Sequence, residues 1–377
     1  MKATLALVVL SLLTSCGFLP QRSGDIDRAV WVTRWDFKTE ADVRDIVRNC
    51  ARAGFDTVFF QVRGQGTVLY ASDYEPWCQE YGFRYPGFDP LQAACDEGRR
   101  QGVAVHAWVN VLAAWKGDTA PPIQNHLYRT RPQWFLYDQT GQRQPLNDGY
   151  VFLNPCLPEV RAYLAGICRE IAHGYAVQGI HLDYMRFPDQ AEGGPDYPRD
   201  ERTVALYKKA TGLEPAEDLG RWNEWKTAQV TRLLDDIDAA VRGGSQRCLV
   251  SAAVFPIRKA ASVHQDRPRW VEGRKVAAVF PMLYNDSDQQ FRADLDEVAE
   301  VTDRSKVFPA IGVYKHARVE QTLGQMDSVA AHGFPGCGLY AYSSFFRTRN
   351  ADEPIEAQDP DIRGQRREAL ISRPRMK

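Results

Sequence analysis

Residues 103–110 read Val-Ala-Val-His-Ala-Trp-Val-Asn, and residues 179–187 read Gly-Ile-His-Leu-Asp-Tyr-Met-Arg-Phe. Both stretches are rich in the β-branched and aromatic residues that favour strands. Stretches of the same kind recur along the chain and begin at Ala29, Thr57, Cys248, Ala277, Val307 and Cys337. The sequence therefore predicts eight strands.

Helical patterns with recognisable ends lie between these strands. One helix is expected to be capped by Thr39 and to end at Gly54, and a second to begin after Asp89 and to end at Gly102. Alternating strands and helices imply a parallel sheet with crossover connections. Eight such units fit a (β/α)8 TIM-type barrel of the α/β class, which we place at residues 28–346.

Three connections are longer than the roughly 30 residues of a strand-and-helix unit. They follow the second, third and fourth strands, and the extra residues lie at 64–88, 111–155 and 188–219. Segments that follow strands lie at the C-terminal face of a barrel, where barrel enzymes place their active sites. We therefore expect the working face beside these three long loops.

Side-chain parity separates the barrel interior from the side that packs on helices. In the third strand, His106, Trp108 and Asn110 alternate with small apolar residues, so we expect them to point inward. The same parity in the second and fourth strands adds Gln61, Arg63, His181 and Asp183. Each of these residues also has a structural interpretation, because Arg63 could neutralise Asp183 and the histidines could be satisfied core residues.

Asp183 is the strongest single candidate for a catalytic residue, because it lies near the end of the fourth strand. A carboxylate there can act as a nucleophile, as a base or as a stabiliser of positive charge. Sugar hydrolysis usually needs a second carboxyl group, roughly 5–10 Å away, to protonate the leaving oxygen. The fifth strand offers none, and we slightly prefer Glu75 among the loop acids, which are Asp36, Asp73, Glu75, Asp266, Glu272, Asp286 and Asp288.

The first residues resemble a secretory signal rather than a part of the fold. A short apolar run is followed by Leu-Thr-Ser-Cys-Gly, which resembles a bacterial lipobox, so we expect residues 1–16 to be a lipoprotein signal with Cys16 lipidated. Gly17 carries no acidic retention signal, which favours the outer membrane of the bacterial cell envelope, facing the periplasm. A plain signal peptide that happens to contain a cysteine is the alternative.

The segments that flank the expected barrel are short. Residues 17–27 are interpreted as a tether between the membrane and the fold. Residues 347–377 are charged and poor in aromatic residues, so we expect a charged, solvated extension.

Composition excludes several classes of function. The chain of 377 residues has 47 basic and 48 acidic side chains, a net charge of −1, so no field attracts nucleic acid. Apart from Cys16, seven of the eight cysteines remain, without a C-x-x-C pair, and we expect buried thiols with at most a disulfide or two. No histidine pair has metal-ligand spacing, so neither a metal nor another cofactor is expected.

The motifs together resemble the glycosyl hydrolase-like family 10, a group of bacterial envelope proteins with a barrel domain. The stretches that carry the resemblance are Arg28-Ala-Val-Trp-Val-Thr, Phe60-Gln-Val-Arg, His106-Ala-Trp-Val-Asn and Gly179-Ile-His-Leu-Asp-Tyr-Met-Arg-Phe-Pro. The similarity covers residues 28–345.

This resemblance implies an envelope-tethered glycosidase that acts on a bacterial polysaccharide, and some relatives are associated with cleavage of peptidoglycan glycan strands. Asp183 would be the central carboxylate, with His181 supporting it from beneath. The expected substrate-binding residues are Gln61, Arg63, His106, Trp108, Asn110, Tyr184, Arg186 and Tyr284, with Trp35, Trp77 and Trp115 as further stacking candidates. Many members read Leu-Asp-Asp-Tyr where this chain reads Leu182-Asp183-Tyr184, so an acid adjacent to Asp183 is missing.

Two other functions compete with hydrolysis of a polysaccharide. The missing neighbour at Tyr184 favours a non-catalytic glycan-binding lipoprotein on the same barrel. Metal-dependent deacetylation or amide hydrolysis is the weaker alternative, because the chain lacks an H-x-H or H-E-x-x-H ligand pair.

Overall fold

Eight parallel strands close into a barrel in the computed structural model, which describes residues 26–189, 195–243, 248–273, 275–300, 303–348 and 361–375. Closure occurs where the first strand pairs with both the second and the last. The barrel strands are β1 (Arg28–Val32), β2 (Thr57–Gly64), β4 (Ala104–Asn110), β7 (Gly179–Asp183), β8 (Leu249–Val254), β9 (Ala278–Leu283), β10 (Ala310–Gly312) and β11 (Cys337–Tyr340). The eight predicted strands and the TIM-type barrel are confirmed.

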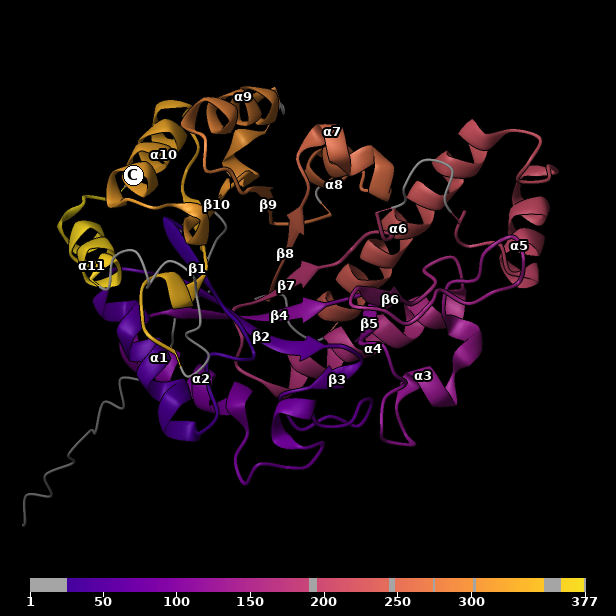
Figure 1. Cartoon of the computed structure of the whole chain (residues 1–377), viewed down its shortest axis with the longest axis horizontal. Helices are drawn as coiled ribbons and strands as arrows, with labels where there is room; N and C mark the ends of the chain where they lie inside the picture. Colours follow the sequence, from indigo (N-terminus) through magenta and orange to yellow (C-terminus); the bar gives the residue numbers. More distant parts are fainter. Residues whose placement is uncertain are drawn as a thin grey trace, which may run out of the picture.

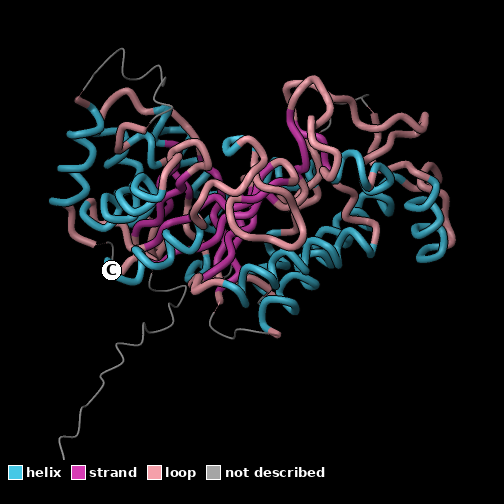
Figure 2. Tube along the Cα trace, turned by 90° about the horizontal axis from the view of Figure 1, so that it is seen from below, coloured by secondary structure: helices cyan, strands magenta, loops and turns pink. Residues whose placement is uncertain are grey.

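Helices surround the strands, which Figure 2 shows in the middle of the molecule. Thr39 caps the first helix with a capping box, and Asp89 caps the second, which ends at Gly102 with a φ of +69°. The outer helices are α1 (Glu40–Arg52), α2 (Pro90–Gln101), α4 (Pro158–Gly174), α6 (Leu219–Arg242), α8 (Arg267–Glu272), α9 (Asp288–Ala299), α10 (Val319–Ala331) and α11 (Ile362–Ser372). Both predicted caps and the stop of the second helix are therefore correct, whereas the first helix ends at Arg52, with Ala53 as its C-cap, before the predicted stop at Gly54.

The long loops carry secondary structure of their own on the side toward which β2 and β4 point in Figure 1. They contain β3 (Thr67–Val68), η2 (Gln79–Tyr81), β5 (Ala113–Lys116), α3 (Leu127–Thr130), η3 (Pro132–Trp134), β6 (Tyr150–Phe152) and α5 (Glu201–Thr211). The remaining short elements are α7 (Ile257–Ala260), η4 (Ala261–Val263), η5 (Arg304–Lys306), η6 (Val313–Lys315) and η7 (Tyr342–Ser344). β5 and β6 pair as a separate antiparallel sheet at the mouth side.

Aromatic side chains fill the barrel interior. The ring of His181 stacks on Phe59 with centroids 3.9 Å apart, and it meets the edges of Trp31 and Phe280. Residues of the opposite parity, such as Val105, pack in the layer between strands and helices. The alternation predicted for the third and fourth strands is therefore correct.

The second strand departs from simple alternation at its end. The register between β2 and β4 shifts between Gln61 and Arg63, so that Gln61 lies opposite Trp108 and Arg63 lies opposite Val109. Val109 packs in the helix layer, and an extra residue in one strand reverses the face on which the next residues lie. Arg63, predicted to point into the barrel, therefore lies on the helix side.

Both ends of the described chain belong to the folded domain. Ile26 and Asp27, assigned to the tether from the sequence, are buried. Residues 361–375, expected to be solvated, include α11, and its Arg366 donates to the carbonyls of Ser344 and His316 at 2.9 and 2.6 Å. The expected signal and Cys16 lie outside the described residues.

The seven remaining cysteines are all buried free thiols: Cys50, Cys78, Cys95, Cys156, Cys168, Cys248 and Cys337. They behave as small core residues, as expected. Within the described ranges, no helix is long and apolar enough to cross a membrane.

Substitution of Gly179 by alanine tests the packing of the barrel interior. A Cβ atom there would lie 2.5 Å from Nδ1 of His106, a fully buried ring on the neighbouring strand. We expect Gly179→Ala to lower the free energy of unfolding by about 1–3 kcal/mol, measured by urea denaturation. Gly324→Ala, within α10 and with no atom near its added Cβ, should be neutral or stabilising. Equal stabilities of the two variants would contradict this packing.

Candidate active site

Asp183 ends β7 at the mouth of the barrel with one occupied and one open carboxylate oxygen. Its Oδ1 accepts hydrogen bonds from the backbone N–H of Tyr184 at 2.6 Å and from Nη1 of Arg186 at 3.2 Å. Its Oδ2 has no hydrogen-bond partner among the described residues and is not sealed from solvent. The two donors hold Oδ1 in place, which leaves Oδ2 free to meet a ligand.

Four tyrosines from distant parts of the chain surround this carboxylate. Burial raises the pKa of each phenol, and the negative charge of Asp183 raises it further. Tyr284 stacks on Tyr340 with centroids 5.4 Å apart, and Tyr150 lies 5.1 Å from Tyr184. The ring of neutral phenols offers flat apolar faces and hydroxyl groups, which suits sugars.

Arg186 is held in place by the aromatic rings on either side of it. Its guanidinium carbon lies 4.2 Å from the ring centroid of Tyr184 and 4.5 Å from that of Phe255. Tyr184 itself adopts a left-handed backbone with a φ of +53°. Both residues lie beside Asp183, and Arg186, rather than Arg63, is the cation that pairs with it.

Sequence reasoning missed Arg34, which follows β1. Its backbone N–H donates to Oε1 of Gln61 at 2.9 Å, and its Nε lies 2.8 Å from Oε1 of Glu80. Its charge also lowers the pKa of Tyr150, against the larger effect of burial. A Cβ at Gly64 would collide with this guanidinium. Gln61, predicted to bind substrate, instead positions Arg34.

The two histidines predicted to take part in the site lie below it. His106 is fully buried in the barrel, and burial lowers its pKa to about 3. Nδ1 of His181 forms a hydrogen bond with the hydroxyl of Ser251 at 2.9 Å, and burial lowers the pKa of His181 as well. His106 is therefore a core residue and not a sugar ligand, while His181 lies beneath Asp183, as expected.

Glu75, preferred as the proton donor, is not at the mouth. Its carboxylate forms a bidentate pair with Arg63, at 2.8 Å to Nε and 2.6 Å to Nη2, and both side chains are fully buried. Nη1 of Arg63 donates to the carbonyls of Asn110 and Val111. This pair therefore holds two loops together, and neither residue reaches Asp183.

Trp108 and Asn110 point inward as predicted and form part of the floor. Asn110 is the register partner of Asp183 on the neighbouring strand, and the Trp108 ring lies 6.4 Å from that of Tyr340. Nε1 of Trp108 and Oδ1 of Asn110 are buried and make no hydrogen bond within the described residues. Unsatisfied buried groups are rare, and here they lie under the open carboxylate.

A small cavity of about 290 Å³ lies beside Tyr340 and the end of the first strand. It is lined by Asp36, Trp35 and Tyr340, among others, and Trp35 is 44% exposed. Oδ2 of Asp36 accepts hydrogen bonds from the backbone and the hydroxyl of Thr33 at 2.6 and 2.9 Å. The other stacking candidates are placed differently: Trp77 faces Tyr85, and Trp115 is buried beside His126.

The sequence profile described as glycosyl hydrolase-like 10 matches residues 27–323. The chain belongs to this family. Glycosyl hydrolase DigH of Escherichia coli (strain K12) is 27% identical over 259 residues, which cover 64% of this chain and 57% of DigH. Glycosyl hydrolase YngK of Bacillus subtilis (strain 168) is 20% identical over 315 residues, which cover 74% of this chain and 58% of YngK. The chain thus spans less than two thirds of each relative.

Solved glycosidases share the fold. A GH42 beta-galactosidase from G. stearothermophilus superimposes with a TM-score of 0.62 at 13% identity, over 94% of this chain and 58% of that chain. Alpha-L-fucosidase isoenzyme 2 from Paenibacillus thiaminolyticus gives a TM-score of 0.61 at 13% identity, over 91% and 49%. These structures show that the fold is shared, and the family match supports a glycosidase-like role. In the part of the chain that the structure describes, no group of three or more His, Cys, Asp or Glu could hold a metal ion.

Removal of the Glu75 charge tests whether this residue is structural or catalytic. Glu75→Gln leaves the Arg63 guanidinium buried without its carboxylate, so we expect the free energy of unfolding to fall by roughly 3–5 kcal/mol in urea denaturation. Glu40→Gln, which removes a surface pair with Arg44, should change it by less than about 1 kcal/mol. A Glu75→Gln protein that keeps full stability and loses turnover would restore Glu75 as the proton donor.

Proposed function

We propose that this chain hydrolyses glycosidic bonds in a polysaccharide of the bacterial cell envelope, with peptidoglycan glycan strands as the first substrate to test. The observation that carries the proposal is the open Oδ2 of Asp183, at the end of a barrel strand and within a ring of tyrosines. A carboxylate in that position can attack the anomeric carbon of a sugar, or it can stabilise the positive charge that develops on the sugar ring. The tyrosine faces would hold neighbouring rings.

A second carboxyl group is needed to protonate the leaving oxygen, and we propose Asp36 for this role. Both Asp183 and Asp36 raise the pKa of Tyr340, after the larger effect of its burial, so Tyr340 lies near both acids. Asp36 and Tyr340 also line the same small cavity. Its position supports a pair of acids that share one aromatic wall, in place of the adjacent acid that this chain lacks.

The proposed cellular location rests on the sequence alone. The lipobox-like segment ending at Cys16 supports attachment of the protein to the membrane by a lipid, and Gly17 supports the outer membrane. In this arrangement the tether that begins at residue 17 holds the barrel in the periplasm, where envelope polysaccharides are within reach.

Replacement of Asp183 by asparagine tests the proposal. Asp183→Asn keeps the size of the side chain but removes its charge, so turnover should fall at least about a hundredfold while thermal stability is retained. The assay incubates each protein with peptide-free and intact glycan strands and detects new reducing ends by mass spectrometry. Asp45→Asn, an exposed residue on α1, serves as the matched control and should keep full activity.

Full turnover by Asp183→Asn would contradict the assignment of Asp183 as the central carboxylate. Binding of glycan strands without any product, by a folded wild-type protein, would instead support the non-catalytic glycan-binding alternative. That alternative is favoured by the ion pair between Asp183 and Arg186, because the cation neutralises the central carboxylate.

A further inference from the structure

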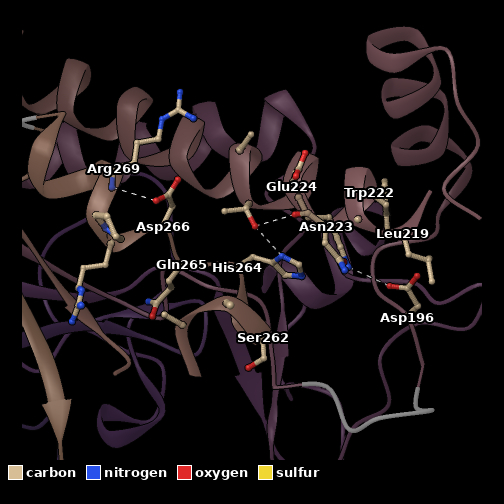
Figure 3. Close-up of a pocket in the computed structure, with 18 residues that line it drawn as sticks. Asp196, Leu219, Trp222, Asn223, Glu224, Ser262, His264, Gln265, Asp266 and Arg269 are labelled. Carbon is tan, nitrogen blue, oxygen red and sulfur yellow. Dashed lines mark hydrogen bonds and ion pairs between the residues drawn. The ribbon is translucent and has the colours of Figure 1, made fainter. Parts of the chain in front are cut away.

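A cavity of about 1000 Å³ lies between α6 and the segment 260–269, outside the ring of tyrosines. Figure 3 shows the ring of His264 projecting into it toward α6. Its volume is at the upper end of the roughly 300–1,000 Å³ typical of small-molecule sites. None of the residues proposed above for catalysis lines it.

His264 presents a bare hydrogen-bond acceptor to this cavity. Thr227 donates its hydroxyl proton to the carbonyl of Asn223 at 2.9 Å, so the Thr227 oxygen can only accept from Nδ1 of His264, 3.1 Å away. Burial, with a further effect of Lys226, lowers the pKa of His264 to about 3, so the ring is neutral. The proton therefore resides on Nδ1, and Nε2 carries a lone pair.

The side chain of His264 is built into the wall and is not a loose surface group. Only 6% of the residue is exposed, its ring lies 5.1 Å from Phe187, and its backbone holds a left-handed φ of +61°. Nε2 has no hydrogen-bond partner among the described residues, yet it is not sealed from the cavity. A non-glycine residue in this backbone conformation is uncommon and concentrates at functional sites.

Side chains of both charges line the cavity, namely Lys226, Arg267 and Arg269 with Asp196, Glu224 and Asp266. Lys226 is paired with Asp196 at 3.3 Å. The guanidinium of Arg267 is buried and has no hydrogen-bond partner among the described residues. The exposed lining groups Asn223, Glu224, Ser262 and Arg269 offer both donors and acceptors, which suits a ligand rich in hydroxyl groups. Leu219, Ala228 and Pro268 add apolar surface for its C–H faces.

This cavity is joined to the site of Asp183 by one short segment. Phe187 donates its backbone N–H to the carbonyl of Val263 at 3.0 Å, and Gln265 donates to the carbonyl of Met185 at 3.4 Å. Arg186 lies between Met185 and Phe187 in the sequence and pairs with Asp183 on the other side of the segment. Three residues lie between Asp183 and Phe187, so their Cα atoms are at most about 14 Å apart.

From these observations we infer that the cavity is a second carbohydrate-binding site, which holds sugar units of the same polysaccharide at a distance from the bond that is cut. His264 accepts a hydrogen bond from a sugar hydroxyl through Nε2, and Glu224 accepts another at the exposed rim. The inference rests on the proposed function for its ligand, but it concerns binding and requires no catalytic step.

Binding of chain-length-matched probes tests this site without turnover. In the Asp183→Asn background, isothermal titration calorimetry compares chitobiose with chitohexaose, and then peptidoglycan glycan strands. His264→Asn, which suits a left-handed backbone because asparagine tolerates it, should weaken binding of the hexaose about tenfold and of the biose less than twofold. Glu224→Ala, at an exposed position that leaves the fold intact, should act in the same direction.

His173→Asn, on the exposed face of α4, is the matched control and should bind all probes like the background protein. The inference is overturned if His264→Asn and Glu224→Ala bind the hexaose and the glycan strands as tightly as this control, or if the control binds no probe. Turnover by the wild-type protein, with binding that does not depend on His264, would support the proposed function and contradict the second site. His264-dependent binding without turnover would support the second site and contradict hydrolysis.

Discussion

The pairing of β1 with both β2 and β11 closes the sheet, and the positions of all groups at the mouth depend on this closure. Residues far apart in the chain meet because parallel strands end at the same rim. Asp183 ends β7, while Tyr340 comes from β11 and Tyr284 follows β9. The interior below them is filled by stacked rings such as Phe59 and His181, so the rim has a rigid floor.

The partners of the buried charges separate structural from chemical carboxylates. Glu75 has both oxygens occupied by Arg63, and removing either partner would leave a bare buried charge. Asp183 is held through one oxygen only, by Arg186 and a backbone N–H, and keeps the other open. His264 repeats this pattern with one bonded and one open ring nitrogen. At both positions, the unoccupied atom of a fixed side chain faces accessible space.

Much of the fold was predictable because strand pattern, helix caps and parity are local properties of the sequence. The same parity placed His106, Trp108 and Asp183 correctly inside the barrel, but it could not show that His106 lies below the reach of a ligand. Arg63 was misplaced because one bulge reverses the face of β2. The helix α11 was missed because its buried side chains include Arg366, whose charge suggests solvent although backbone carbonyls satisfy it. Arg34 lies in a loop without a side-chain period, so no pattern could reveal it. Tyr340 was not among the predicted site residues, although it has the same side-chain parity as Gly338 in the last strand, and this parity was an available signal.

The most direct test of the central role of Asp183 is a crystal structure of the Asp183→Asn protein with bound chitohexaose. The account predicts a sugar ring with its anomeric carbon beside the side chain at position 183, and a neighbouring ring against Tyr284 and Tyr340. An oligosaccharide that is well ordered on the protein but lies away from position 183 and the tyrosine ring would contradict it.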